Sequence, residues 1–413
     1  MRITTFFKKI LKLIGTIVES AHVSSSTDKE KQGRIVIRVR PKKKRLRCGQ
    51  CGRKAEGRHG KKGKLRWWRD LGIRKIPVYL VCRVHRVRCK KCGVKTMQVP
   101  WARVGSIFTK AFEDEVAWFM QKTNQSATAR YFRISWTTAG KIIRRVVAEK
   151  LDGSLLENLR LLGVDEISYG RPRKFLTVVV DHEKHRVIWA AEGQSSETLA
   201  DFFKLLGPLK CSAIEAISID MDPAFEKAIR DHAPAAEIVY DRFHIVQLLS
   251  RATDEVRRQE VAQAPFDEKR DLKNSRWPIL KNPWNLTPSE TGKLATIQET
   301  NQRIYRAYLL KESFQRLFDA HSIESAEADF NQWYGWARRS RLEPFKKLAV
   351  TLRRHLPGIL RFLKRNLTNS AVEGWNSKIR MISHRAFGFR SAEALIAMIK
   401  LNCSGIELSP IGY

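Results

Sequence analysis

Two copies of the motif Cys-x-x-Cys-Gly, at residues 48–52 and 89–93, constrain the fold of this chain more than any other feature. Two thiolates on one tight turn can reach a single tetrahedral ion, and the glycine that follows permits the turn. The start of the chain does not resemble a secretory signal, because lysines interrupt its apolar run. Paired cysteines then favour metal ligation over disulfides. We expect a structural Zn²⁺ on Cys48, Cys51, Cys89 and Cys92.

A predicted strand pair, Leu65–Leu71 and Ile76–Arg88, fills the sequence between the two motifs. Cys82 and His85 form an alternative pair of ligands within the second strand. However, alternate residues of a strand share one face, and Cys82 shares its face with aliphatic residues. A buried, unreactive Cys82 is therefore favoured, and Cys211 and Cys403 are expected in the core.

The charge of the chain predicts a polyanionic partner. Lys and Arg number 78 against 42 acids, a formal net charge of +36, and residues 34–95 hold 24 of these cations with two acids. Nucleic acid is the commonest such partner, and an anionic membrane surface is the alternative. No window of 18 apolar residues occurs, so we expect no membrane span and a cytoplasmic, nucleoid-associated protein.

Patterns along the chain predict a multidomain α+β and α/β protein. We expect an N-terminal helix and strand at 1–47, a zinc-binding domain at 48–100 and a helix-turn-helix at 101–150. A catalytic domain would occupy 151–262, a helical insertion 263–365, and the last helical part of the catalytic domain 366–413. Trp333, Tyr334 and Trp336 in the insertion are expected in its core, although stacking on an unpaired base is an alternative.

Three helices are predicted between residues 101 and 150. Ser135 is a good N-cap for the third helix, Trp136–Val147, whose aliphatic residues can face a core. Its polar face would then contact bases and phosphates in the major groove. A plain three-helix packing unit is the alternative. The predicted DNA-binding residues are Thr137, Thr138, Lys141, Arg144, Arg145, Lys42, Lys43, Lys44, Arg45 and Arg66.

The order β-β-β-α-β-α-β-α over residues 161–262 matches the ribonuclease H-like fold, a mixed sheet with helices on both faces. Asp165 and Asp220 each end an apolar strand, and these strands are expected to be neighbours. Carboxylates that converge from separate elements can hold two divalent ions for phosphoryl transfer. Capping or pairing with arginine is the alternative role, and Asp222 is a less favoured alternative to Asp220.

The third acid is predicted to be Glu373, on a helix that also presents Asn376 and Arg380 on the same face. Ser370 and Glu373 have the spacing of a capping box, so capping is the competing role. Asp241 and His244 could support metal or DNA contacts, or could cap the helix that begins there.

These stretches together resemble the ISL-three family of bacterial insertion-sequence transposases. The matching segments are Gly163-Val-Asp165-Glu166, Ser218-Ile-Asp220-Met, Tyr240-Asp-Arg-Phe-His244, Asn369 through Arg380 and Arg385 through Arg390. The resemblance covers nearly the whole chain. It implies a DDE transposase with Asp165, Asp220 and Glu373 as the metal-binding triad, Mg²⁺ as the cofactor (two ions, with Mn²⁺ as a substitute) and Arg380 as a DNA contact.

The resemblance also implies the partners and the reaction. The 152 residues between Asp220 and Glu373 would include a helical insertion domain. Double-stranded DNA, as terminal inverted repeats and as target, would be cleaved and joined by a homodimer or larger assembly. A DNA-binding regulator without activity and a nuclease that does not join strands are the alternatives.

Overall fold

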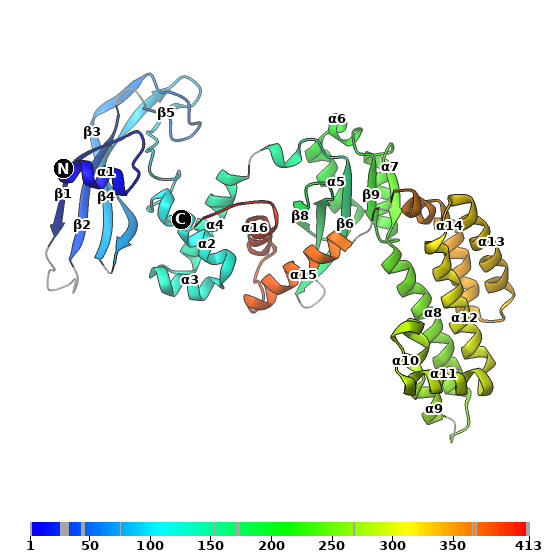
Figure 1. Ribbon diagram of the computed structural model, residues 1–413. Helices are drawn as coiled ribbons and strands as arrows, with labels where there is room; N and C mark the ends of the chain where they lie inside the picture. Colours follow the sequence, from blue (N-terminus) through cyan, green and yellow to red (C-terminus); the bar gives the residue numbers. More distant parts are fainter. Residues whose placement is uncertain are drawn as a thin grey trace. The chain divides into compact units, whose positions relative to one another are not determined.

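The computed structural model describes residues 2–24, 33–42, 46–74, 76–151, 153–170, 174–266, 269–365, 367 and 370–409, with a few side chains left out (Figure 1). The chain divides into two compact units. The first comprises Met1–Asp152 with Lys400–Tyr413, and the second comprises Gly153–Ile399. The predicted segment 366–413 is therefore divided between the units at residue 400.

The first unit contains a sheet in which β1, β2, β4 and β3 lie side by side in that order, with β5 paired to β4. The predicted strands are present and longer than expected. The sequence pattern missed β1, because its apolar residues continue the spacing of the short helix α1 that precedes it. The elements are α1 (Ile3–Ile10), β1 (Thr16–Ser24), β2 (Arg34–Pro41), β3 (Gly57–Ile73), β4 (Ile76–Cys89) and β5 (Gly93–Thr96).

Three helices follow in the same unit: α2 (Lys110–Lys122), α3 (Gln125–Phe132) and α4 (Trp136–Lys150). The Ser135 hydroxyl accepts a hydrogen bond from the Thr138 backbone N–H at 3.1 Å, as predicted for the N-cap of α4. Arg133 ends α3 in the left-handed region, with φ 51°, which turns the chain sharply between the two helices. The aliphatic side of α4, Ile142, Ile143 and Val146, is buried against α2 and α3.

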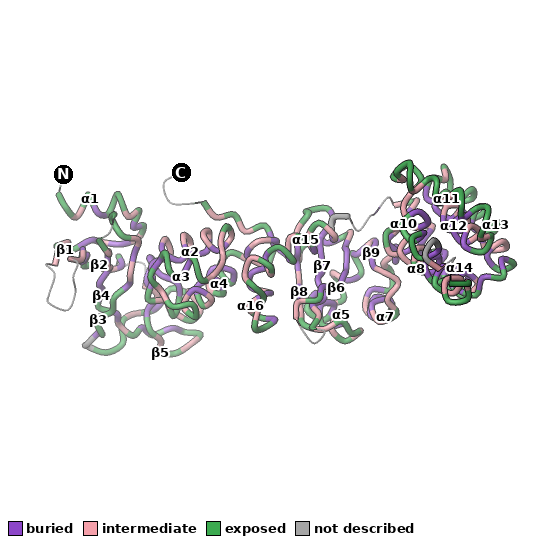
Figure 2. The backbone as a smooth tube through the Cα atoms, turned by 90° about the horizontal axis from the view of Figure 1, so that it is seen from below, coloured by how far each residue is buried: buried purple, intermediate pink, exposed green. Residues whose placement is uncertain are grey.

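The second unit is built on a mixed sheet with the order β10-β9-β6-β7-β8. β6, β7 and β8 form an antiparallel meander, and β9 and β10 run parallel to β6. Figure 2 shows this sheet as largely buried. The predicted order of strands and helices is observed. The strands are β6 (Leu161–Gly170), β7 (Lys174–Asp181), β8 (Arg186–Glu192), β9 (Ala216–Ile219) and β10 (Glu237–Tyr240).

Helices of this unit pack on the sheet and on one another. α15 lies against β6, α14 lies against β10, and α5 packs on α7. Gly358 of α14 permits the contact with β10, because a Cβ there would lie 2.4 Å from the Tyr240 ring. The short helix α6 was not predicted. These helices are α5 (Ser196–Leu206), α6 (Pro208–Cys211), α7 (Pro223–His232), α14 (Glu343–Arg365) and α15 (Ser370–Arg385). The boundary between the two units falls within α16 (Ala392–Cys403).

The long helix α8 (Arg242–Gln263) starts at the end of β10 and continues into a group of helices (Figure 1). Trp333 is buried there and its Nε1 donates to the Leu310 carbonyl at 2.8 Å, so this tryptophan is part of the core, as favoured. No helix in the described part of the chain has the length and apolarity to cross a membrane. The remaining helices are α9 (Lys269–Asn274), α10 (Arg276–Leu280), α11 (Pro288–Thr300), α12 (Gln302–Gln315) and α13 (Ile323–Arg339).

Candidate functional site

Three aspartates lie at one level across three neighbouring strands. Gly163 of β6 pairs with Ser218 of β9, and two further residues along this register bring Asp165 level with Asp220. Ile219 of β9 pairs with Tyr240 of β10, and the Asp241 N–H donates to the Ile219 carbonyl at 3.1 Å. Asp241 is therefore the next acid in the same row. β9 and β10 end just before these acids, whereas β6 continues past Asp165 to Gly170, because it still pairs with β7 there.

The helix α15 reaches this row through a close contact at Gly163. A Cβ on Gly163 would lie 2.4 Å from Cγ2 of Val372 and 2.6 Å from Nε2 of His182, so only glycine fits between them. Asp165, two residues along the strand, faces the same side. Its Oδ2 accepts a hydrogen bond from Asn376 Nδ2 at 2.5 Å, and both residues are buried. Asn376, predicted as a supporting residue, therefore contacts Asp165 directly.

Glu373 lies one turn before Asn376 on α15 and is partly buried. Its carboxylate is within electrostatic range of Asp165 and Asp241, and Arg380 and His244 partly offset their repulsion. Arg380, two turns further on, is exposed. The competing capping role depends on the Ser370 side chain, which lies outside the described residues.

Burial and mutual repulsion raise the pKa values of this acidic group. Burial is the largest cause for Asp220 and, with Asp165 and Asp222 nearby, raises its pKa to about 6. Glu166 also has its pKa raised to about 6, by burial first and then by the repulsion of Asp220 and Asp222. The pKa values of Asp165 and Glu373 are raised as well, again chiefly by burial. Several acids that repel one another in a buried place form a site suited to cations.

Asp220 has the clearest ligand-like environment. Its Oδ1 is buried, and no residue that the structure describes donates a hydrogen bond to it. A buried carboxylate oxygen without a donor is costly, and a divalent cation would compensate it. Asp222 instead caps α7 by accepting from the Ala224 N–H at 2.6 Å, which agrees with the preference for Asp220.

Asp241 precedes α8 but makes no side-chain capping bond to it, and its Oδ2 lies 4.0 Å from His244 Nε2. The capping interpretation of Asp241 is therefore not supported. Glu166 lies within one of the segments that resemble the transposase family, but the sequence predicts no role for it. Its carboxylate lies within electrostatic range of Asp220 and Asp222.

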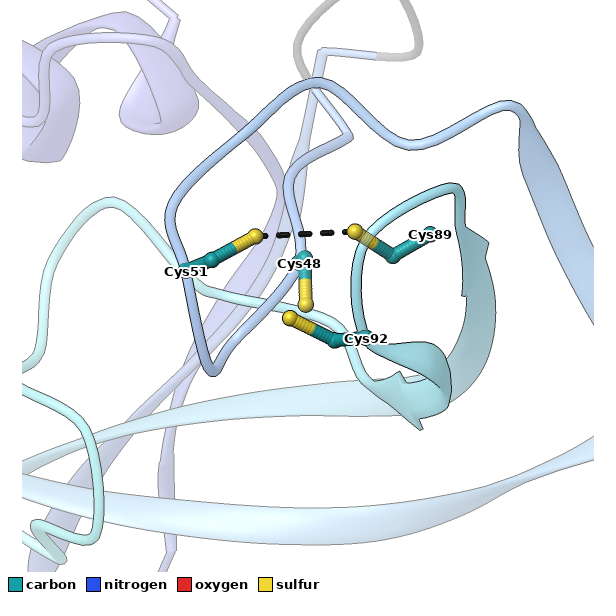
Figure 3. Close-up of side chains that lie close together, drawn as sticks. All are labelled: Cys48, Cys51, Cys89 and Cys92. Carbon is teal, nitrogen blue, oxygen red and sulfur yellow. Dashed lines mark hydrogen bonds between the residues drawn. The ribbon is translucent and has the colours of Figure 1, made fainter.

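Four sulfur atoms form a compact group in the first unit (Figure 3). The Sγ atoms of Cys48, Cys51, Cys89 and Cys92 all lie within 4.8 Å of one another, and Cys51 Sγ is 3.5 Å from Cys89 Sγ. Tetrahedral Zn–S bonds of about 2.3 Å would require sulfurs at roughly this spacing. Gly52 and Gly93 have φ near +70°, so the glycine after each pair makes the turn. This group could hold a metal ion.

Among the described residues, the cysteine group alone has all its ligand atoms this close together, and the three predicted catalytic acids do not meet that spacing. A two-ion site does not require it, because separate acids contact separate ions. Cys82 is buried outside the cysteine group, and burial raises the pKa of its thiol to about 12. Cys82 is thus the unreactive residue expected.

Some of the predicted DNA-binding side chains contact other residues of the protein, and most of those described are exposed. Arg145 is engaged: its Nε donates to Glu113 Oε1 at 2.8 Å, and Glu113 is fully buried. The hydroxyls of Thr137 and Thr138 lie 3.0 and 2.7 Å from the Ser135 hydroxyl at the start of α4. Lys43, Lys44 and Arg45 lie outside the described residues. The exposed members are Thr137, Lys141, Arg144, Lys42 and Arg66.

Two models of known sequence families match separate parts of the chain. Residues 162–399 match the sequence family described as "Transposase", in its ISL3 form, and residues 97–147 match the "Helix-turn-helix domain of transposase family ISL3". The second match spans α2, α3 and α4 and the first spans the mixed sheet, the inserted helices and α15.

Similar curated proteins cover nearly the whole chain. The transposase for insertion sequence element IS1557 from two Mycobacterium tuberculosis strains is 37% identical over 399 residues, covering 90% of this chain and 89% of that protein. The transposase for insertion sequence element IS1001 from Bordetella parapertussis is 31% identical over 376 residues, covering 90% and 92%.

A solved structure of a simian T-cell lymphotropic virus intasome with PP2A regulatory subunit B56 gamma covers 43% of this chain and 70% of the matched chain at 18% identity. Its TM-score of 0.16 is too low to bear on the fold. The family matches and the two curated relatives are sufficient: this chain belongs to the ISL3 family of insertion-sequence transposases.

Proposed function

We propose that Asp165, Asp220 and Glu373 form a DDE triad that cleaves and joins DNA at the ends of an insertion sequence. The observation that carries this proposal is the row of acids: Asp165 and Asp220 lie level on adjacent strands, and α15 contacts Asp165 through Asn376. Glu373 stands one turn away on that helix. We also propose that the mixed sheet is ribonuclease H-like, which its order of elements and strand directions support.

Two Mg²⁺ ions, with Mn²⁺ as a substitute, are the proposed cofactor. The donor set consists of carboxylate oxygens, which Mg²⁺ prefers, and the buried Asp220 Oδ1 lacks a donor among the described residues. When bound, the ions would lower the pKa of the attacking hydroxyl and neutralise charge at the phosphate.

The residues around the triad would act mainly by positioning. Asn376 holds the Asp165 carboxylate in one orientation through its hydrogen bond. Arg380 on the same helix would contact a DNA phosphate and offset the repulsion between that phosphate and the acids. Asp241, the third acid of the row, and the neighbouring His244 would add charge at the edge of the triad and help to orient the DNA there.

DNA recognition is assigned to the first unit. The exposed residues of α4 would enter the major groove, and the basic strands β3 and β4 would contact the backbone. The substrates would be the terminal inverted repeats and a target duplex in the cytoplasm, at the nucleoid. Two ends must be processed together, so we propose a homodimer or a larger assembly on DNA.

The cysteine group is proposed to bind structural Zn²⁺. A closed four-thiolate site has no open position for catalysis and would hold the loop after residue 46 against β4 and β5. Purified protein should contain one zinc per chain, and Cys51→Ser should lose it and lower the melting temperature. Cys82→Ala should keep the metal, because Cys82 lies outside the group. Full-length zinc-free protein with unchanged melting temperature would contradict this role.

Cleavage of labelled DNA that ends in the element's own repeat tests the catalytic proposal. We expect Mg²⁺-dependent cuts at the repeat boundary and joined products, all lost in Glu373→Gln while DNA binding is kept. Glu343→Gln, at an exposed position at the start of α14, is the matched control and should cleave normally. Specific binding without cleavage, in Mn²⁺ as well, would favour a DNA-binding regulator, and cleavage without joined products would favour a nuclease.

A further inference from the structure

A cavity of about 620 Å³ adjoins the row of acids in the second unit. Asp241, at the end of β10, and Glu373 of α15 line it together with residues of the inserted helices. Its volume is within the range of sites that hold small organic ligands, roughly 300–1,000 Å³. Of the predicted triad only Glu373 lines this cavity, so binding of metal ions by the triad does not explain what the cavity holds.

The walls combine flat groups with a neutral polar group. Arg242 lies with its guanidinium carbon 4.8 Å from the centre of the Phe318 ring, so a planar cation lies against an aromatic wall. Phe243 of α8 also lines the cavity and is 53% exposed, which is high for a phenylalanine. Aromatic rings and guanidinium planes are the surfaces on which nucleic-acid bases stack.

Gln315 supplies hydrogen-bonding capacity that the protein does not use. It lines the cavity, is 9% exposed, and its carboxamide nitrogen is buried without an acceptor among the described residues. Leaving such a group unsatisfied is costly, so a ligand that offers an acceptor would be stabilised there. Base edges carry such acceptors, and neutral amide groups commonly bond to them.

We infer that this cavity receives an unpaired nucleobase of the DNA strand held at the triad. A phosphate is disfavoured as the occupant, because Asp241 and Glu373 form part of the wall. A base within a duplex cannot reach the cavity, so the nucleotide must leave the stack beside the scissile phosphate. Stacking on Phe243 and Arg242 and a bond to Gln315 would offset the lost stacking. This inference rests on the proposed DNA-cleaving function of the neighbouring acids.

Fluorescence of 2-aminopurine tests the inference without cleavage. The full-length protein is mixed, in Ca²⁺, with repeat-end DNA that carries 2-aminopurine at one position at a time on both sides of the cleavage boundary. We expect fluorescence to rise severalfold at one or two adjacent positions. Phe243→Ala and Gln315→Leu should each remove most of the rise while the affinity for DNA changes less than about threefold, because α4 and the basic strands dominate binding.

Phe266→Ala is the matched control, since Phe266 is exposed and does not line the cavity, and it should behave as wild type. Cleavage of DNA with an abasic nucleotide at the responding position gives a second measurement. Phe243→Ala should cleave intact DNA more slowly than wild type, but it should cleave the abasic DNA at the wild-type rate, because no base remains to be bound. A melting temperature near that of wild type should accompany each variant, and Phe243→Ala keeps the test valid if Gln315→Leu fails to fold.

Unchanged fluorescence at every position, or a full rise in Phe243→Ala, would overturn the inference. If Mg²⁺-dependent cleavage persists in that case, the proposed catalytic function stands and only the base cavity is wrong. If fluorescence rises but no DNA is cleaved, the cavity is supported and the catalytic proposal fails.

Discussion

Asn376 Nδ2 donates a hydrogen bond to Asp165 Oδ2 at 2.5 Å, joining the first strand of the mixed sheet to a helix 211 residues later in the chain. The helical insertion lies between these two residues. This contact links Glu373, one turn earlier on α15, to the row of acids on the sheet. The hydrogen bond therefore joins the parts of the domain that precede and follow the helical insertion.

Replacing Asn376 by alanine should slow DNA cleavage roughly 10- to 100-fold, because the Asp165 carboxylate would lose its orienting partner. Affinity for repeat-end DNA in Ca²⁺ should stay within about threefold of wild type. Asn331→Ala, at an exposed position of α13, is the control. Equal cleavage rates for Asn376→Ala and the control would contradict a positioning role.

Gly163→Val should separate α15 from β6. The added side chain would overlap Val372 and His182, and overpacking of this kind costs about 1–3 kcal/mol. Cleavage should fall further than stability suggests, since Glu373 and Asn376 move with the helix. Gly170→Val tests the same strand at a place where a Cβ meets only the flexible Lys174 side chain, at 3.4 Å. Similar urea unfolding and cleavage for both variants would be inconsistent with this packing.

The acidic group should make the metal-free protein sensitive to pH. Burial and repulsion raise the pKa values of Asp220 and Glu166 to about 6, so the folded chain retains protons that the unfolded chain releases near pH 4. Their contribution to stability is then greatest below about pH 4 and is lost as pH rises toward 6 and above.

In EDTA at pH 7.5, Asp220→Asn should therefore melt roughly 2–5 °C above wild type, and the difference should vanish near pH 4. Mg²⁺ should raise the melting temperature of wild type at pH 7.5 but not that of the variant. Asp231→Asn, on the exposed side of α7, should match wild type throughout. A variant less stable than wild type in EDTA would show that Asp220 is not repelled by its neighbours.

Two adjacent arginines of α4 should behave differently. Arg144 is exposed, so Arg144→Ala should weaken DNA binding and lower the slope of log affinity against log salt by about one, without a change in melting temperature. Arg145 pairs with the fully buried Glu113, so Arg145→Ala should cost about 1–3 kcal/mol of folding stability. Salt-dependent binding and thermal unfolding of both variants separate these roles, and a swapped outcome would contradict the assignment.

The sequence predicted those features of the structure that depend on residues close together in the chain. Spacing over a few residues predicts the cysteine motifs, the Ser135 cap and the alternation of buried and exposed side chains along β2 and β4. The same local patterns predict the order of elements around the mixed sheet. The position of Asp165 relative to Asp220 followed from the expectation that their strands are neighbours.

Features that depend on contacts between residues far apart in the chain could not be predicted from such local patterns. Arg145 has the polar character of a DNA contact, and only the fold shows that Glu113 engages it. β1 follows α1 with apolar residues that suit either a helix or a strand, and pairing with β2 decides between them. The base cavity brings Phe243 together with Gln315 and Phe318 from distant helices, which no short pattern records.

Exchange of one proposed metal ligand for a thiol tests the central claim most directly. Asp220→Cys should cleave repeat-end DNA at least about 100-fold more slowly than wild type in Mg²⁺, which binds thiolates poorly, and should regain activity in Mn²⁺, which accepts them more readily. Asp231→Cys should match wild type in both metals. Cleavage by Asp220→Cys at the wild-type rate in Mg²⁺ would contradict a metal-binding role for Asp220 and, with it, the proposed triad.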